Sequence, residues 1–580
     1  MRNILILVLL LALSLSIYAE GTKELMPFAS DSVGRAVIVL SKGIAQGNYG
    51  HFAVSTAPEE SRIYFTIFSS TEKVYLGFNF RKGTNPTYVI KKYPSGTIVK
   101  PSAVVPSSGS GYISSYNRAI LGPAAITTGG YNATLWNPPS SGDYYIEFAY
   151  TATGGFGAPD AILQYFDCTV ASNSNTPIPG RVWSKNWFLS TEGNTNLDVF
   201  RGKLYPYSDD QIVTEINFNG IRPYFFRVTC NPNGCNNTEP FTEARKSRNG
   251  NYTYPQYKIF LNNPDPTLYP TGILGAVTSV NTLSNCNGTV DVNINVNKSG
   301  QVSLLIDINP LPGYQPEDVN LTADVTSSST NTIIWDGLNG LGQQVANGTN
   351  VSVVVTYING LTNLPMYDVE YSPSGFIVNL IRPTGTKPAV FWDDTNLDPA
   401  ALQLNGCTNV TGCHTWSNFI GNENTLNTWW YSLSTTLAPL PVYYKKSDLI
   451  LLNQTICPGD SILFEGTYYK TAGVYTHNFT NFTGCDSTRK LTLTQLVGPF
   501  VELGNDTIVC YASSLILSAP TNPTLPYTYL WNTGQTLSQI SVNTTGTYSV
   551  LVSAPNGCSH QDQIMVTFPP AILSKPIKHF

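Results

Sequence analysis

The feature that most restricts the fold of this chain is a repeat near its C-terminus. Two stretches each open at a cysteine, Cys457 and Cys510, and each close at a Gly-Cys pair that ends in Cys485 or Cys558. Apolar residues stand five and seven positions after each opening cysteine, and again six and eight positions after each closing one. A period of two is typical of a half-buried strand, so the repeat predicts two small β-sandwich modules. Nothing in this pattern points to catalysis.

Alternation of apolar and polar residues continues through most of the chain, whereas helical periodicity is nearly absent after the first 19 residues. The sequence therefore predicts an all-β protein made of tandem antiparallel β-sandwich domains. The length of 580 residues is enough for several such domains. The expected organisation is a signal peptide (1–19), an N-terminal sandwich (20–170), a β-rich domain (171–285), an Ig-like domain (286–380), a Trp/Asn-rich insertion or small domain (381–445), two short repeats (446–496 and 497–570) and a tail (571–580).

The N-terminal segment has the pattern of an export signal. Arg2 precedes an apolar run from Ile4 to Leu13, and Ile-Tyr-Ala stands directly before Glu20. This order predicts a secretory signal peptide. A bilayer span requires about 20 apolar residues, and neither this run nor any later one is that long. We therefore expect a secreted or cell-surface protein without a transmembrane segment in the mature chain.

Ten cysteines in an exported chain predict disulfides, because oxidising compartments preserve them. The repeat favours one bridge inside each short module, short separations favour two more, and the last pair follows by elimination. The expected pairs are Cys457 with Cys485, Cys510 with Cys558, Cys230 with Cys235, Cys407 with Cys413, and Cys168 with Cys286.

The charge content restricts the partners that this protein can bind. Charged residues make up 12% of the chain and the net charge is −5, whereas about 25% of residues are charged in average domains. No long basic run is present, so nucleic-acid binding lacks its electrostatic requirement. A surface rich in Asn, Thr, Ser and Tyr suits contacts with glycans or with cell-surface proteins.

Catalytic motifs are missing from the sequence, and we predict no catalytic residue. It contains no H-E-x-x-H, G-x-S-x-G or P-loop motif, and its five histidines are scattered. The histidine of most interest is His414, with Asp393, Asp394 and Glu423 not far from it in sequence. A metal or acid–base site there is weighed against a structural loop beside Cys413, and the structural loop is favoured.

The acidic pair Asp393 and Asp394 allows three interpretations. With Asn396 it offers oxygen ligands of the kind that calcium prefers. With Glu423 it offers a pair of carboxylates for glycoside hydrolysis, which we disfavour. Hydrogen bonds within turns are the third and preferred interpretation. We therefore expect no cofactor, with calcium as the alternative.

Three tryptophans are the best candidates for a ligand-binding surface: Trp416, Trp429 and Trp430. Adjacent residues on a strand point to opposite faces, so both Trp429 and Trp430 are buried only if their strand lies between two layers. On an edge strand one of them is exposed and offers a stacking platform for a sugar.

The two short modules also resemble a known group of repeats. The residues that carry the resemblance are Cys457–Ser461, Ala472–Tyr475 and Gly484–Ser487 in the first module, and Leu503–Thr507, Tyr529–Gly534 and Gly546–Val550 in the second. These stretches resemble the Ig-like and PKD-like repeats of gliding-associated cell-surface proteins that are exported by type IX secretion. Such proteins commonly end in a sorting domain, and this chain departs from that pattern by stopping at Phe580.

A second resemblance supports the Ig-like domain at 286–380. Trp335-Asp336-Gly337, followed by Gly340 and Asn347-Gly348-Thr349, is similar to the W-D-G…G-T pattern of hook-capping-type Ig-like domains. Together the two resemblances imply a non-enzymatic surface adhesin or scaffold. The alternative is a carbohydrate-binding accessory protein that acts on an extracellular polysaccharide.

Overall fold

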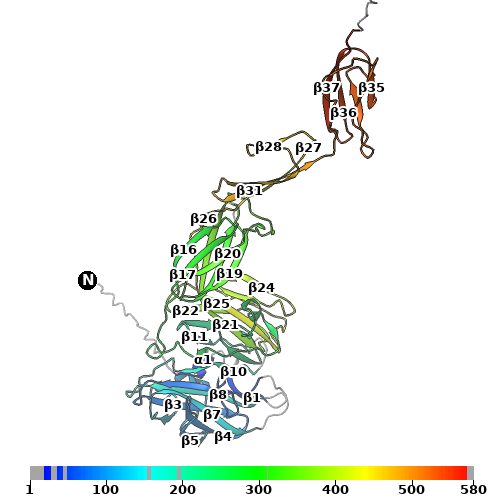
Figure 1. The fold of residues 1–580 in the computed structure, drawn as a ribbon. Helices are drawn as coiled ribbons and strands as arrows, with labels where there is room; N and C mark the ends of the chain where they lie inside the picture. Colours follow the sequence, from blue (N-terminus) through cyan, green and yellow to red (C-terminus); the bar gives the residue numbers. More distant parts are fainter. Residues whose placement is uncertain are drawn as a thin grey trace, which may run out of the picture.

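The computed structural model describes residues 19–27, 36–42, 49–152, 159–192, 198–309, 311 and 313–570. The predicted signal peptide, except for Ala19, and the predicted tail at 571–580 lie outside these residues. The structure is 49% strand and 3% helix and is built from several antiparallel sheets, so the predicted all-β class is confirmed. Figure 1 shows a large body followed by three smaller units in a line. Among the described residues, no helix has the length and apolarity that a membrane crossing requires.

The large body, which we call the head, comprises the described residues within 19–274 and residues 361–432. One of its sheets has the strand order β22 (Ile377–Arg382), β12 (Val213–Asn217), β11 (Lys203–Tyr207), β15 (Lys258–Phe260), β9 (Val182–Ser184), β2 (Ile63–Ile67), β7 (Gly142–Thr151), β4 (Thr84–Lys92), β5 (Ile98–Val104).

The second sheet of the head runs through strands from both halves of the sequence. Its order is β24 (Leu402–Cys407), β23 (Val390–Asp393), β25 (Asn424–Thr436), β21 (Asn350–Tyr367), β13 (Phe225–Thr229), β10 (Asn186–Ser190), β1 (Val37–Lys42), β8 (Pro159–Ala171), β3 (Lys73–Arg81), β6 (Thr134–Trp136), with β14 (Arg248–Asn249) beside β25. The described helices are short: α1 (Thr22–Leu25), α2 (Tyr116–Leu121) and α3 (Phe241–Ala244).

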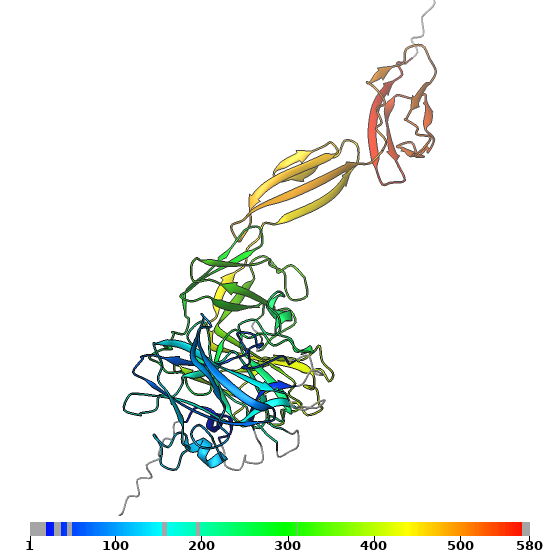
Figure 2. The same cartoon turned by 90° about the horizontal axis from the view of Figure 1, so that it is seen from below.

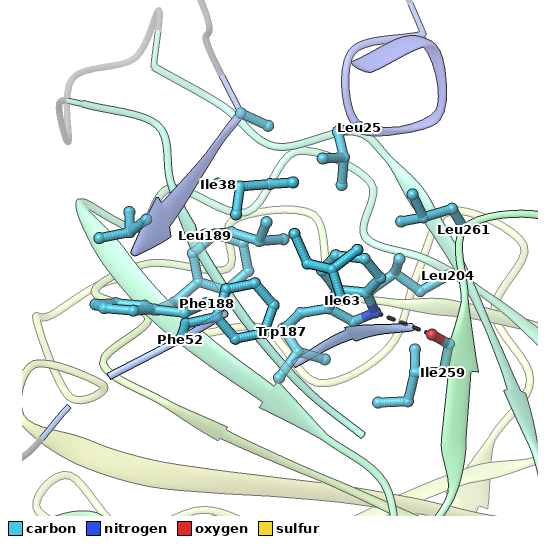
Figure 3. Close-up of a cluster of buried hydrophobic side chains, with 14 of the residues drawn as sticks. Leu25, Ile38, Phe52, Ile63, Trp187, Phe188, Leu189, Leu204, Ile259 and Leu261 are labelled. Carbon is cyan, nitrogen blue, oxygen red and sulfur yellow. Dashed lines mark hydrogen bonds between the residues drawn. The ribbon is translucent and has the colours of Figure 1, made fainter. Parts of the chain in front are cut away.

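The expected boundary at residue 170 does not exist in the structure. Strand β9 pairs with β2, and β10 pairs with β1, so the segment 171–285 extends both sheets that residues 20–170 begin. One hydrophobic core reaches from Leu25 to Trp430, and Figure 3 shows part of it, with the Trp187 indole donating a 2.9 Å hydrogen bond to the carbonyl oxygen of Ile259. Segment 381–445 also belongs to this sheet system rather than to a separate insertion. Local alternation marks strands, but it does not reveal which distant strand each one joins.

The Ig-like domain comprises residues 275–360 and 433–446. Its remaining strands are β16 (Val277–Ser284), β17 (Val290–Val296), β18 (Gly300–Asp307), β19 (Val319–Val325), β20 (Asn331–Trp335) and β26 (Leu440–Tyr443). Its core centres on the buried Trp335, whose indole donates to the carbonyl oxygen of Leu338 at 2.8 Å. The 18-residue strand β21 pairs with β18 here and with β13 in the head. This shared strand and its neighbour β25 join the Ig-like domain to the head. The limits of the domain therefore differ from those expected at 286 and 380.

The first stalk module comprises residues 447–496 and has a very small core. Its strands are β27 (Leu449–Ile456), β28 (Ile462–Phe464), β29 (Thr467–Tyr469), β30 (Gly473–Thr480) and β31 (Asp486–Gln495). Four residues are buried together in its core: Ile456, Phe464, Leu491 and Leu493.

The second stalk module comprises residues 497–570. Its strands are β32 (Thr507–Ile508), β33 (Leu515–Ser518), β34 (Thr528–Trp531), β35 (Gln539–Val542), β36 (Gly546–Ser553) and β37 (Ser559–Thr567). Both of its sheets contain only these strands, and its core, centred on Trp531, contains only residues between Val501 and Phe568. It is therefore a self-contained folding unit.

Candidate functional site

The predicted aromatic platform is not present on the surface. Trp429 is 1% exposed, Trp430 is 0% exposed and Trp416 is 8% exposed. Strand β25 is central, between β21 and β23, and both of its faces are covered. Trp430 packs into the head core on one face, and Phe241, Phe391 and Arg245 contact Trp429 on the other. The prediction of an exposed sugar platform at these residues is wrong, because it depended on β25 being an edge strand.

The predicted calcium ligands do not converge. Asp393 accepts hydrogen bonds from the backbone N–H and the hydroxyl of Thr395, at 3.1 and 2.6 Å. Asp394 is buried and turned toward Ser247, whereas Asn396 is exposed. Across the described residues, no three His, Cys, Asp or Glu side chains are grouped in a way that would hold a metal ion. The carboxylates act in turns and in a buried network instead.

His414 lies at the centre of that buried network. Its Nε2 is 2.8 Å from Oδ2 of Asp394, and its Nδ1 is 2.7 Å from the hydroxyl oxygen of Thr428. The hydroxyl of Ser247 donates to the other oxygen of Asp394, and the Trp392 ring stacks on the imidazole at 4.9 Å. The His414 side chain is 1% exposed, so this chain of polar groups fixes the head core and offers no access to a substrate.

A second buried polar network holds the first residues of the head. Arg181 donates to both oxygens of Glu72 at 3.1 Å, and its Nη2 lies 2.7 Å from Asp265. Next to it, Glu20 accepts backbone hydrogen bonds from Gly180, Arg181 and Val182 at distances of 3.1 to 3.2 Å. Burial raises the pKa of the Glu20 carboxyl well above its ordinary value, with the nearby Glu24 adding to the shift.

The disulfides differ from most of the expected pairs. The structure contains Cys286–Cys485, Cys407–Cys413 and Cys457–Cys558, and leaves Cys168, Cys230, Cys235 and Cys510 as thiols. Only Cys407–Cys413 is confirmed. The expected pairs Cys457–Cys485, Cys510–Cys558, Cys230–Cys235 and Cys168–Cys286 are wrong.

Strand pairing explains why the two cysteines of one module do not meet. In the first stalk module, β27 runs parallel to β31, with Ile456 opposite Gln495. Cys457 therefore lies at the end of β31, whereas Cys485 lies directly before its start. The ten residues of β31 separate the two by about 33 Å, because a strand rises about 3.3 Å per residue. The second stalk module has the same arrangement, with Ile508 opposite Thr567 at the end of β37.

The other two wrong pairs involve buried thiols of the head. Cys168 lies in the middle of β8, within the head core, whereas Cys286 lies at the far end of the Ig-like domain. Cys230 and Cys235 are both buried in the head, where burial raises the pKa of each thiol well above its ordinary value.

The first junction joins the Ig-like domain to the first stalk module by more than the peptide chain. The Cys286–Cys485 disulfide crosses it, and the N–H of Ser447 donates to the carbonyl oxygen of Cys286 at 2.7 Å. The side-chain amide of Asn481 donates to the carbonyl oxygen of Lys446 and to Oδ2 of Asp448, each at 2.9 Å. The turn that ends in Cys485 is therefore fixed to the segment that leaves the Ig-like domain.

The second junction repeats this design between the two stalk modules. The Cys457–Cys558 disulfide crosses it, and the side-chain amide of Asn556 donates to the carbonyl oxygen of Val497 at 2.6 Å. A Cβ at Gly498 would lie 2.7 Å from Cβ of Cys558 and 3.1 Å from Cδ of Pro458, so a side chain does not fit at this linker position. These junction asparagines were missed from the sequence, although both stand shortly before a Gly-Cys pair.

Comparison with known proteins identifies no family. No family model matches the chain, and no curated protein matches it. Among solved structures, extracellular domains 3-5 of Drosophila OTK are 9% identical, with coverage of 51% of this chain and 99% of that one and a TM-score of 0.12. The eight N-terminal Ig domains of Down Syndrome Cell Adhesion Molecule are 7% identical, with coverage of 86% and 61% and a TM-score of 0.13.

A third solved structure is SGBP-B of the mixed-linkage glucan utilization locus of Bacteroides ovatus, in complex with a heptasaccharide. It is 10% identical, with coverage of 51% of this chain and 71% of that one and a TM-score of 0.10. TM-scores as low as these carry no argument about this chain.

Proposed function

We propose that this protein works outside the cell as a non-enzymatic adhesin or scaffold, in which the head is held away from its attachment by a disulfide-stapled stalk. The observation that carries the proposal is that two disulfides cross successive junctions between modules. Figures 1 and 2 show the head at one end and the second stalk module at the other.

A junction held at two points resists bending. Domains joined by a single peptide linker ordinarily move relative to one another. Here each junction has the linker, a disulfide and at least one asparagine side chain that holds the linker carbonyl. The hinge motion that a single linker allows would therefore be suppressed at both junctions, which suits a protein that presents a binding domain at a distance.

The place of action is inferred from the cysteine chemistry. Bridges between modules persist only in an oxidising compartment, which favours a secreted or cell-surface protein. Cell-surface proteins or glycans are the partners that a weakly charged, polar surface suits. The stalk repeats Cys457–Ser461 and Leu503–Thr507 further support membership in the gliding-associated, type IX secreted group.

A binding screen with two proteins tests whether the head and Ig-like domain bind the partner while the stalk modules only hold them at a distance. The full chain and a chain ending at residue 446 are passed over immobilised glycans and purified extracellular protein domains. The shorter chain carries Cys286→Ser, because the deletion removes the partner of that thiol. Equal binding by both places the activity in the head and Ig-like domain, as proposed.

Two results would contradict the proposal. Binding that disappears with residues 447–570 would make the stalk modules the binding surface. Cleavage of a glycan or protein during the screen would make the protein an enzyme.

A further inference from the structure

The opening cysteines occupy equivalent places in successive modules. Cys457 follows β27, where the N–H of Leu496 donates to the carbonyl oxygen of Ile456 at 2.9 Å. Cys510 follows β32, where the N–H of Val509 donates to the carbonyl oxygen of Thr567 at the same distance. In both modules the parallel pairing of the first strand with the last therefore sets the opening cysteine beside the point where the chain leaves the sandwich.

Cys286 occupies the same kind of place in the Ig-like domain, because Ser447, the first residue past that domain, donates its N–H to the Cys286 carbonyl. Both Cys286 and Cys457 form a disulfide with the closing cysteine of the next module. The disulfides therefore follow one direction along the molecule. Each joins a cysteine near the point where the chain leaves one domain to the closing cysteine of the next module.

The closing cysteines are presented by matching turns. In the first stalk module the N–H of Asn481 donates to the carbonyl oxygen of Cys485 at 2.9 Å, and the N–H of Gly484 donates back to Asn481 at 3.0 Å. In the second module Ala554, Gly557 and Cys558 make the same two bonds, at 2.7 and 3.1 Å. A side-chain amide near each turn also holds the carbonyl of the incoming linker.

Cys510 is the third cysteine of this series. Among the residues that the structure describes, it has no disulfide partner. Its thiol is exposed, and the neighbouring Tyr511 is fully exposed. We infer that Cys510 is a covalent docking site for the Gly-Cys turn of a further sandwich module, carried by a partner polypeptide. Cys485 and Cys558 already form disulfides, so neither closing cysteine of the two stalk modules is free to pair with Cys510. An unpaired cysteine in an exported protein is itself a sign of intermolecular pairing.

Bond formation at this site is a two-electron oxidation. The thiols of Cys510 and of the incoming turn each lose a hydrogen and form one S–S bond. A small-molecule disulfide such as oxidised glutathione accepts the two electrons and two protons and becomes two thiols, by way of a mixed disulfide. This inference rests on the proposed stalk function, because it continues the same stapled series past the second stalk module.

The test uses the second stalk module itself as the probe. The probe is residues 497–570 with Cys510→Ser, which folds as a self-contained unit and has Cys558 as its only thiol. It is mixed with the full chain in a buffer of reduced and oxidised glutathione, and the products are digested without reduction. We expect a peptide in which Cys510 of the full chain is joined to Cys558 of the probe.

A matched exposed thiol distinguishes docking from chance oxidation. The control is the full chain with Cys510→Ser and Thr533→Cys, which moves the thiol to another exposed position on the same module. Docking raises the effective concentration of the incoming thiol, so we expect coupling at Cys510 to be roughly tenfold faster or more. Equal rates would overturn the inference and make Cys510 an ordinary exposed thiol.

If the isolated probe does not fold, the full chain with Cys457→Ser and Cys510→Ser supplies the same free turn cysteine, and the same comparison of rates decides. Failure here is distinguishable from failure of the proposed function, because binding by the head does not depend on Cys510.

Discussion

At the scale of single residues, the head contains carboxyl groups whose burial outweighs their hydrogen bonds and the nearby charge of Lys23. Asp167 accepts hydrogen bonds from the N–H of Glu20 at 3.0 Å and from the Tyr131 hydroxyl at 2.6 Å. Burial raises the pKa of Asp167 to about 7 and that of Glu24 to about 8. The folded head therefore retains protons that the unfolded chain has released, so the contribution of these two groups to its stability is full below about pH 4 and is lost as the pH rises through 7 to 8.

Asp167→Asn should remove part of this pH dependence. The amide carries no charge, and the Tyr131 hydroxyl can rotate to accept a hydrogen bond from it. We expect the variant to be close to wild type at pH 5 and to unfold at a clearly higher temperature than wild type at pH 9. Thermal unfolding followed at pH 5, 7 and 9 measures this. The exposed residue Asp486 provides the control, Asp486→Asn, and parallel curves for Asp167→Asn and wild type would refute the account.

Arg181 is the residue whose loss should cost the head most. Its side chain is 2% exposed and binds two carboxylates, on Glu72 and Asp265. Arg181→Met would leave both carboxylates buried without their cation, which costs about 3 to 5 kcal/mol. Denaturant unfolding should show this loss. Lys91→Met breaks the more exposed pair with Glu147 and should cost about 1 kcal/mol or less, so similar losses for the two variants would contradict our account of Arg181.

At the scale of elements, the first stalk module depends on its disulfides more than on its core. Four clustered buried side chains are a small core for 50 residues. The Cys286–Cys485 bridge spans 199 residues, so chain entropy assigns it roughly 5 kcal/mol, against roughly 2 kcal/mol for Cys407–Cys413, which spans 6.

Replacing both Cys286 and Cys485 with serine should therefore loosen residues 447–496 selectively. We expect amide hydrogen exchange in β27 and β31 to become much faster, while exchange in the head strands stays the same. The chain with Cys407→Ser and Cys413→Ser is the control and should leave β27 and β31 protected. Unchanged protection of β27 and β31 in the Cys286/Cys485 variant would show that the module is stable without its staple.

The sequence predicts elements better than it predicts their partners. The period-two residues of the repeat, such as Phe464, Leu491 and Leu517, are buried as expected. The direction of the disulfides was missed because pairing within a module and pairing between modules have the same cysteine spacing. The parallel contact of the first strand with the last decides between them, and no local pattern reveals it. The sequence left open whether Trp429 and Trp430 are both buried for the same reason, because β25 is central only once β21 and β23 have joined it.

At the scale of the whole molecule, we propose a head on a stalk whose two junctions are stiffened by disulfides. Replacing Cys286, Cys457, Cys485 and Cys558 with serine leaves each joint with a peptide linker and its hydrogen bonds. We expect small-angle X-ray scattering of the wild type to fit one extended arrangement, whereas the fourfold variant requires a broad ensemble. The Cys407/Cys413 variant should scatter like wild type, and a fourfold variant that also did so would contradict a stiffening role.

The most direct measurement is a disulfide map of the protein produced in an oxidising compartment, obtained by mass spectrometry of a digest made without reduction. We expect peptides that link Cys286 to Cys485 and Cys457 to Cys558. Peptides that link Cys457 to Cys485 or Cys510 to Cys558 would place the bridges inside the modules, and the stapled stalk would then be wrong.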